Sequence, residues 1–318
     1  MTRSPLALAA LATVAIPGLD ARDVRPAGGP GTDFDVAVVT DAERKRWAVR
    51  APVHAAAGAA LEAELALLGA LAHHADTGAL PFDVPRVAGS VPLEGGGRAV
   101  VHPVLRGSEV RLESLTGGPG LAAAIGRSVA AIHELPTSIV EDAGLASYDA
   151  QSYRERRLSE VDEAARTGKV PGTLLRRWEE RLENVAWWRF RPTVVHGDLT
   201  ASHVLTDGHL VTGVLGWGEA KVADPADDLA WLLVAAPSDA VESIMEAYQL
   251  RRTELKDPHL TDRALLAGEL ALARWLLFGV RTKQDDVVAD AEEMLAELEA
   301  HVAEEQASEV EQDEPLEE

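Results

Sequence analysis

The segment 193–215, TVVHGDLTASHVLTDGHLVTGVL, constrains the fold more than any other part of the chain. An apolar strand is expected to end at His196-Gly197-Asp198, where Gly197 permits a tight turn and Asp198 projects from the strand end. Residues 204–215 follow the apolar-turn-apolar pattern of a hairpin. The pattern therefore predicts a loop that presents an acidic side chain. The simpler alternative is that Asp198 only caps a turn and that His203 only packs.

The first 105 residues predict a small sheet with one packed helix. Alternation in DFDVAVVT, with Phe34, Val36 and Val38 on one face, predicts a strand. After a polar turn, residues 46–51 predict its return strand. Helical spacing predicts a helix over 55–74, and the stretch 91–105 predicts a hairpin around its three glycines.

The N-terminal stretch allows two interpretations. Arg3, followed by apolar residues from Leu6 to Ile16, resembles a secretory signal, but a convincing small-x-small cleavage site is missing. The stretch is also too short to span a membrane, and no other segment approaches that length. We therefore expect an amphipathic helix that ends at Pro17-Gly18. Its predicted core residues are Leu6, Leu8, Leu11 and Val14.

Helical patterns predominate from about residue 107 onward. Helices are expected near 119–135, 171–188, 261–280 and 284–305, with Pro171 opening the second and Thr261 capping the third. The third is apolar nearly all round, which predicts a central buried helix. The acidic end, which lacks basic and aromatic residues, predicts disorder. The expected domains are 1–105, 106–301 and a disordered tail over 302–318.

Composition narrows the classes of function. The formal charge of −22 argues against nonspecific binding to nucleic acid, whose phosphates would be repelled. That charge suits a cationic small molecule, or serves solubility alone. The chain contains no cysteine, which excludes disulfides, thiolate zinc sites and a cysteine nucleophile. A cysteine-free chain fits a reducing compartment, so we expect a cytoplasmic protein with no membrane partner.

The central motif resembles the aminoglycoside phosphotransferase superfamily and, within it, the macrolide 2′-phosphotransferases. Macrolide kinases resemble HGDL…HVL…GxIDWxEAxVxDPAxD, and this chain has HGDLTASHVL and TGVLGWGEAKVADPADDLA. The segments DFDVAVVT, RWAVRAP, LEAELALLGAL, DAGLASY and RRWEERL are similar too. The resemblance implies an α+β, bilobal, protein-kinase-like fold with a small sheet-containing N-lobe and a mostly helical C-lobe. A hinge near residues 102–108 would place a cleft between the mixed N-terminal part and the helical C-terminal part, where ligands tend to bind.

The resemblance implies a role for each matching residue. Asp198 is the catalytic aspartate that contacts the acceptor hydroxyl, His196 braces its loop, and His203 lies at the first metal position. Arg50 contacts nucleotide phosphates, and Glu64 is its partner from the helix. The remaining implied residues are the nucleotide-covering Gly28, Gly29 and Gly31, the purine-binding connector with His102 and Val104, and Asp228, which ties down the catalytic loop.

The chain departs from the family pattern at Gly216, where an aspartate normally binds magnesium. Magnesium prefers hard oxygen ligands, whereas glycine offers no side chain and a histidine at 203 offers only nitrogen. Three replacements are conceivable: Glu219 or Asp224 reaching inward, Asp198 holding the metal directly, or water.

Two functions follow from these observations. The first is transfer of the γ-phosphoryl group of ATP or GTP, with Mg²⁺, to a hydroxyl of a small molecule such as a cationic amino-sugar macrolide. The second is a catalytically inactive, kinase-like protein that binds nucleotide, a small molecule or a protein partner. If the protein is an active enzyme, Asp198→Asn should abolish its phosphoryl-transfer activity, and Gly216→Asp should raise its turnover or its magnesium affinity.

Overall fold

The computed structural model describes residues 3–27, 33–254 and 256–313, and the chain divides into two compact units. Unit 1 consists of residues 1–147, 193–222 and 235–255. Unit 2 consists of residues 148–192, 223–234 and 256–318. The expected boundary after residue 105 falls inside unit 1, and the division into lobes stays a prediction.

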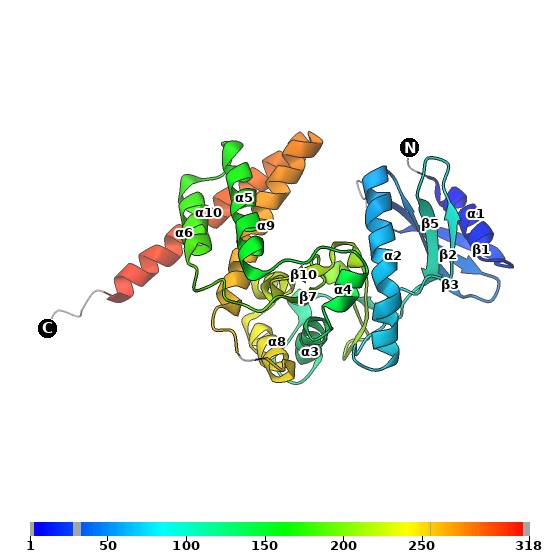
Figure 1. Ribbon diagram of the computed structural model, residues 1–318, viewed down its shortest axis with the longest axis horizontal. Coiled ribbons are helices and arrows are strands. Elements are labelled where there is room, and N and C mark those ends of the chain that lie inside the picture. Colours follow the sequence, from blue (N-terminus) through cyan, green and yellow to red (C-terminus); the bar gives the residue numbers. More distant parts are fainter. Residues whose placement is uncertain (1–2, 28–32, 255, 314–318) are drawn as a thin grey trace. The chain divides into compact units, whose positions relative to one another are not determined.

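A five-stranded antiparallel sheet begins unit 1, in the order β1-β2-β3-β5-β4 (Figure 1). Its strands are β1 (Ala21–Ala27), β2 (Phe34–Asp41), β3 (Arg46–Pro52), β4 (Gly89–Pro92) and β5 (Arg98–Pro103). The strand pair β2–β3 and the hairpin β4–β5 were predicted. Strand β1 was not, because its sequence ARDVRPA carries charges and a proline, which are typical of an edge strand.

The two faces of β2 differ in how deeply their side chains are buried. The sequence placed Phe34, Val36 and Val38 on one face, and these residues are only half-buried, while Ala37 and Val39 of the opposite face are fully buried. Strand pairing sets Val36 opposite Arg50, so the half-buried face of β2 is also the face that carries Arg50. The alternation therefore predicted the strand correctly, but not which face belongs to the core.

Helix α1 (Pro5–Ala15) covers the buried face of the sheet. Leu8 and Ala12, one turn apart, are buried, and Leu11 packs against the same cluster. The predicted core positions Leu6 and Val14 are wrong, since these side chains are 75% and 67% exposed. The sheet contacts a narrow stripe of this short helix, so apolar spacing alone overestimated its buried face. The core cluster is Leu8, Ala12, Ala37, Val39, Trp47, Val49, Ala51, Ala99 and Val101.

Among the described residues, the rest of unit 1 consists of four α-helices and five short strands, and most of these strands come from the motif residues 193–223. Its helices are α2 (Ala55–Asp76), α3 (Leu121–His133), α4 (Ser138–Asp142) and α8 (Ser238–Arg251). Its further strands are β6 (Ser108–Glu109), β7 (Thr193–Val195), β8 (Val204–Thr206), β9 (Val211–Val214) and β10 (Lys221–Ala223). Strands β6-β8-β9 form one small sheet and β7 pairs with β10, so the predicted strand and hairpin around the motif are confirmed.

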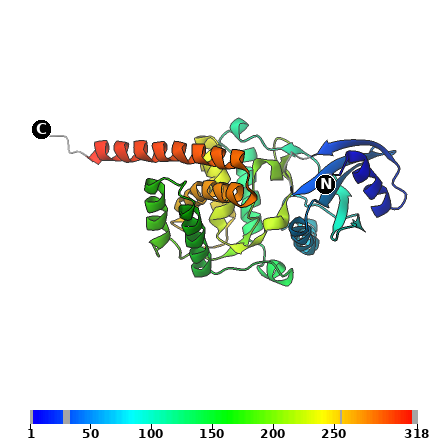
Figure 2. The ribbon, with the colours of Figure 1, turned by 90° about the horizontal axis from the view of Figure 1, so that it is seen from above.

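Unit 2 is helical. Its elements are α5 (Ala150–Arg166), α6 (Gly172–Glu183), α7 (Ala230–Ala235), α9 (Leu260–Thr282) and α10 (Asp285–Asp313). Helix α9 packs against both α5 and α10 (Figures 1 and 2). The sequence predicted α6, α9 and α10, but it assigned no helix to the strongly charged segment that forms α5.

Helices α9 and α10 differ from the sequence-based expectations in three respects. Helix α9 is not buried all round, because Trp275 and Phe278 are 38% and 40% exposed and stack on each other. Its cap is His259, so Thr261 lies inside the first turn and the predicted cap is wrong. Helix α10 continues to Asp313 and so overlaps the tail for which the sequence predicts disorder. The last five residues lie outside the described part.

One helix of the described residues, α2, is long and apolar enough to cross a membrane by length and composition, so the expectation that no further segment approaches that length is wrong. A core helix passes the same test. Glu64 is buried in the middle of α2 and bound to a strand arginine, and Leu61, Leu67 and Leu71 are buried on the helix as well. The helix thus packs as part of unit 1.

Candidate active site

The motif loop is held by a buried histidine. Strand β7 ends at Val195, and the next residue, His196, is fully buried against the Trp217 ring, with ring centroids 4.7 Å apart. Its Nε2 donates to the carbonyl oxygen of Leu215 at 2.7 Å, and its Nδ1 accepts from the backbone N–H of Asp198 at 3.3 Å. Both ring nitrogens are therefore used in opposite senses, which fits one neutral tautomer and fixes the start of the loop.

Asp198 is presented to solvent by this arrangement. Its side chain is 53% exposed, and one carboxylate oxygen lies 3.8 Å from Nδ1 of His203. Gly197, directly before it, has a φ of +81°, a conformation that favours glycine. The loop thus turns sharply and leaves the carboxylate accessible, as the motif predicts.

His203 and Gly216 face each other across the hairpin. The backbone N–H of Leu215 donates to the carbonyl oxygen of His203 at 2.9 Å, which continues the β8–β9 pairing. Nδ1 of His203 donates to the carbonyl oxygen of Asp198 at 2.6 Å, since a carbonyl can only accept. Gly216 has a φ of +79°, and a Cβ built there would lie 2.6 Å from Nε2 of His203. The histidine ring therefore fills the space that a side chain at position 216 would need.

The residues present do not form the expected magnesium site. Among the described residues, no group of three or more His, Asp or Glu side chains is placed to hold a metal ion. Asp224, one conceivable replacement ligand, is buried and bound at two points by Arg263, at 2.7 and 3.0 Å. Burial raises the pKa of the Asp224 carboxyl, and its bonds to Arg263 oppose that rise. Glu219 is exposed near the loop, but it is a single carboxylate.

Arg50 and Glu64 form a pair between strand β3 and helix α2. Nη1 of Arg50 lies 2.9 Å from both carboxylate oxygens of Glu64, whose side chain is 1% exposed. The Arg50 guanidinium also lies over the Phe34 ring, 4.5 Å from its centroid. Two contacts thus hold the guanidinium on the half-buried face of the sheet. Its contact with phosphates stays a prediction.

The predicted purine connector is partly engaged within the sheet. The Val104 N–H donates to the carbonyl oxygen of Arg46 at 3.0 Å, so a purine cannot use this donor while that bond is made. Nδ1 of His102 donates to the carbonyl oxygen of Pro103 at 2.9 Å. Burial lowers the pKa of His102, and the nearby Arg50 charge lowers it further, while the bond to Pro103 opposes both. The predicted glycines Gly28, Gly29 and Gly31 lie outside the described residues.

Asp228 is fully buried, as expected for a structural aspartate, and its carbonyl oxygen accepts from the indole of Trp231. Its implied tie to the catalytic loop stays a prediction. The sequence analysis missed Lys221, whose amino group approaches the backbone of the loop. The residue stands in the quoted motif, between Glu219 and the DPADD segment, but a lone lysine carries no pattern that would single it out.

A known protein family matches the part of the chain that carries the candidate site. The phosphotransferase enzyme family (APH) matches residues 23–266, most of the chain, including β2, α2 and the whole motif segment. The chain belongs to this family. The match confirms the resemblance carried by the motif residues and covers both Arg50 and Asp198.

Solved structures of phosphotransferases show the same α+β, kinase-like fold. Macrolide 2′-phosphotransferase MphH from Brachybacterium faecium superposes with a TM-score of 0.76 at 24% identity, over 90% of this chain and 96% of that one. A macrolide 2′-phosphotransferase type I has a TM-score of 0.76 at 25% identity, over 93% and 98%. Aminoglycoside 2′-phosphotransferase-IIIa, solved with GDP, has a TM-score of 0.78 at 18% identity, over 94% and 99%.

One curated relative shares a short, closer match. The uncharacterized protein YcbJ of Bacillus subtilis (strain 168) is 47% identical over 60 residues, which are 19% of this chain. The match spans 20% of that relative. The match therefore indicates that the two proteins are related over this segment, and it gives no information on activity.

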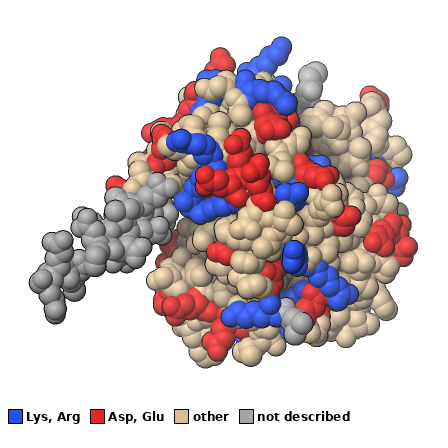
Figure 3. All heavy atoms as spheres, turned by 60° about the vertical axis from the view of Figure 1, so that its left-hand side comes forward, with Lys and Arg blue, Asp and Glu red and all other residues tan. Residues whose placement is uncertain are grey.

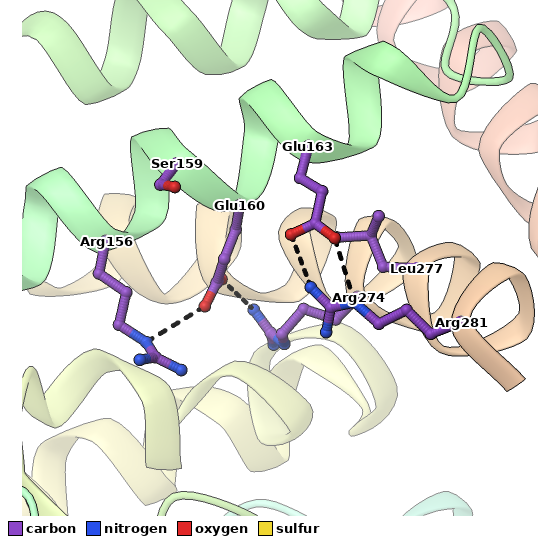
Figure 4. Close-up of a pocket in the computed structure, with 7 residues that line it drawn as sticks. All are labelled: Arg156, Ser159, Glu160, Glu163, Arg274, Leu277 and Arg281. Atoms are coloured by element: carbon purple, nitrogen blue, oxygen red, sulfur yellow. Dashed lines mark hydrogen bonds and ion pairs between the residues drawn. The ribbon is translucent and has the colours of Figure 1, made fainter.

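A separate hollow lies in unit 2, between α5 and α9 (Figure 4). It is lined by Arg156, Ser159, Glu160, Glu163, Arg274, Leu277 and Arg281. Its charges pair with one another, Arg156 with Glu160 at 3.3 Å and Arg281 with Glu163 at 2.6 Å. Acidic and basic side chains are similarly interleaved on the face shown in Figure 3. None of the predicted site residues lines this hollow, in which three arginines face two glutamates.

Proposed function

We propose that this chain transfers the γ-phosphoryl group of ATP or GTP to a hydroxyl of a small molecule. The observation that carries the proposal is the exposed Asp198 carboxylate on a loop locked by His196, in a chain of the phosphotransferase family. Phosphoryl transfer depends on positioning and charge stabilisation more than on covalent chemistry. A rigid loop with one free carboxylate supplies the positioning.

Asp198 would orient the acceptor. One carboxylate oxygen accepts the hydrogen bond of the attacking hydroxyl and aims the hydroxyl lone pair at the γ-phosphorus. It takes the proton as the new P–O bond forms and the bond from the γ-phosphorus to the β–γ bridging oxygen breaks, which releases the nucleoside diphosphate. The neutral His196 ring keeps the Asp198 backbone in place. The Nδ1 atom of His203 lies 3.8 Å from the same carboxylate.

The nucleotide would bind along the half-buried face of β2 and β3. Arg50 offers a guanidinium that Glu64 and Phe34 hold in one orientation, and such a fork suits phosphate oxygens. Relatives were solved with GDP and with ADP, so either purine nucleotide is a reasonable donor for this chain. The expected Mg²⁺ does not fit the residues around position 216, and no step proposed for the protein side chains requires it.

The acceptor is proposed to be a cationic hydroxylated molecule of the macrolide or aminoglycoside type. Related phosphotransferases were solved with kanamycin and with gentamicin. The formal charge of −22 attracts cations to the surface and repels nucleic acid. We further propose that the protein acts in the cytoplasm, where nucleoside triphosphates are supplied, without a membrane or nucleic-acid partner.

A second candidate function rests on Gly216. A family member that lacks a side chain at this position, and whose His203 ring fills the space, can bind nucleotide without turnover. Metal charge stabilisation is worth several kcal/mol in such sites, so an uncompensated loss would abolish most activity. In that case the protein would act by binding nucleotide, a small molecule or a protein partner.

The deciding experiment measures transfer of radiolabelled γ-phosphate from ATP and from GTP to a panel of macrolides and aminoglycosides. We expect a labelled product with at least one acceptor. Asp198→Asn should lower its rate about 10²- to 10⁴-fold, the usual contribution of a positioned general base.

Asp162→Asn is the matched control, since it removes the same charge from an exposed position on α5 and should leave the rate unchanged. Equal rates for Asp198→Asn and the wild type would contradict the assigned role of Asp198. Nucleotide binding in calorimetry without any labelled product would instead support the second function.

A further inference from the structure

A metal-binding side chain cannot be accommodated at position 216, and the reason is not only that the residue there is glycine. Its backbone is left-handed, and the His203 ring lies where the first side-chain atom would be. His203 cannot turn away freely, because its Nδ1 donates to the carbonyl oxygen of Asp198 at 2.6 Å. The loop therefore lacks a negatively charged group at this position to hold a cation against the phosphates.

A fixed cation lies at the other side of the same loop. Nζ of Lys221 donates to the carbonyl oxygen of Glu219 at 3.3 Å, which directs the side chain back toward the loop. A Cβ built on Gly197 would lie 2.5 Å from this nitrogen, so the ammonium rests directly against the Gly197 backbone. Glycine is required before Asp198 because its φ is +81° and a Cβ there would also lie far inside van der Waals contact with the carbonyl oxygen of Glu219.

The Lys221 ammonium is not neutralised by the protein. Lys221 is half-buried, and among the described residues no carboxylate lies within ion-pair distance of its Nζ. An ammonium carries three donors, and one carbonyl oxygen occupies only one of them. Two N–H groups and the full positive charge remain for an anion at the loop that carries Asp198.

We propose that the Lys221 ammonium supplies the positive charge which a metal ion bound at position 216 would supply, so that this chain binds nucleoside triphosphate phosphates without a divalent cation. The proposal rests on the nucleotide site of the proposed function. Lys221 binds phosphate oxygens directly, and Gly197 leaves room for its ammonium beside the loop. A fixed ammonium beside the loop performs electrostatic stabilisation without reorganisation when the nucleotide arrives.

The test is calorimetric binding of ATP and of GTP in EDTA and in MgCl₂, with the wild type, Lys221→Met and Lys221→Arg. The wild type should bind at least one free nucleotide in EDTA, within about threefold of its affinity in MgCl₂. Lys221→Met should weaken binding of the free nucleotide about 10- to 100-fold, the range expected for one charge-assisted contact. Lys221→Arg should restore most of the affinity.

Lys169→Met is the matched control, because it removes the same charge from a side chain that pairs with Glu292 in unit 2, and it should bind as the wild type does. Equal affinity of Lys221→Met and the wild type for free nucleotide overturns the proposal, and the proposed function then survives with a metal as its cation. Absence of binding to either nucleotide in both buffers overturns the proposed function as well. Equal melting temperatures of the variants establish that they are folded.

Discussion

At the scale of single residues, the His203 ring fills the space that a side chain at position 216 would need. The hairpin register brings them together, and the hydrogen bond from Nδ1 of His203 to the Asp198 carbonyl holds the ring in place. A substitution at either position must therefore be considered together with the other. The expectation that Gly216→Asp alone raises magnesium affinity changes for this reason.

Gly216→Asp by itself should destabilise the protein by about 1–3 kcal/mol, because it combines a left-handed backbone with displacement of a bound histidine ring. It should not create magnesium affinity. The double variant with His203→Asn opens the space, so it should recover the part of the lost stability that comes from the displaced ring and should show a magnesium response. Urea unfolding and magnesium titration measure the two effects.

His203→Asn alone is the control, and it should show no magnesium response of its own. If Gly216→Asp alone unfolds at the wild-type urea concentration and binds magnesium, the steric account of the pair is incorrect.

At the scale of elements, close packing decides more than helix propensity does. Helices α3 and α8 cross at Gly126, where a Cβ would lie far inside van der Waals contact with the Ile244 carbonyl oxygen. Gly69 in α2 is also inside a helix, but nothing lies within 4 Å of its Cβ position. The same residue type therefore has opposite meanings in the two helices.

Gly126→Ala should destabilise the protein by about 1–3 kcal/mol, because the two helices must move apart to admit the methyl group. Gly69→Ala should stabilise it by about 1 kcal/mol, since alanine is the better helix former and meets no neighbour. Denaturant unfolding of the two variants beside the wild type tests both signs. Destabilisation by both, or by neither, would refute the packing argument.

At the scale of the whole molecule, the formal charge of −22 is the dominant electrostatic fact. The 52 acidic residues outnumber the 30 basic ones, so the folded chain repels itself more than the extended chain does. Salt at 0.15 M already reduces the range of such repulsion to about 8 Å. The stability of the fold should therefore depend on ionic strength.

We expect the melting temperature to rise by several degrees between low-salt buffer and about 0.5 M NaCl, where the screening length falls below roughly 5 Å. Sodium chloride is suitable for this test because sulfate would also strengthen apolar burial. Scanning calorimetry at several salt concentrations measures the effect. A melting temperature that stays constant or falls with salt would show that ion pairs, and not repulsion, dominate.

The sequence by itself determined the features that depend on local pattern. The HGD turn, the hairpin 204–215, the strands around residues 34–52 and the helices α2, α3, α6, α9 and α10 follow from periodicity, glycine and proline positions, and the family motif. These features are short-range, so neighbouring residues carry all the information that they need. The pairing of Arg50 with Glu64 was also inferred, because the family resemblance implies both roles.

Only the tertiary structure decided which surfaces meet. The alternation in β2 could not tell that its Phe34–Val38 face carries Arg50 while Ala37 and Val39 lie in the core under α1. The sequence likewise showed a missing aspartate at Gly216, but not the histidine ring that fills its place or the Lys221 ammonium against Gly197. These contacts join residues through the register of strands and the path of loops. They depend on distances in space that no spacing along the chain encodes.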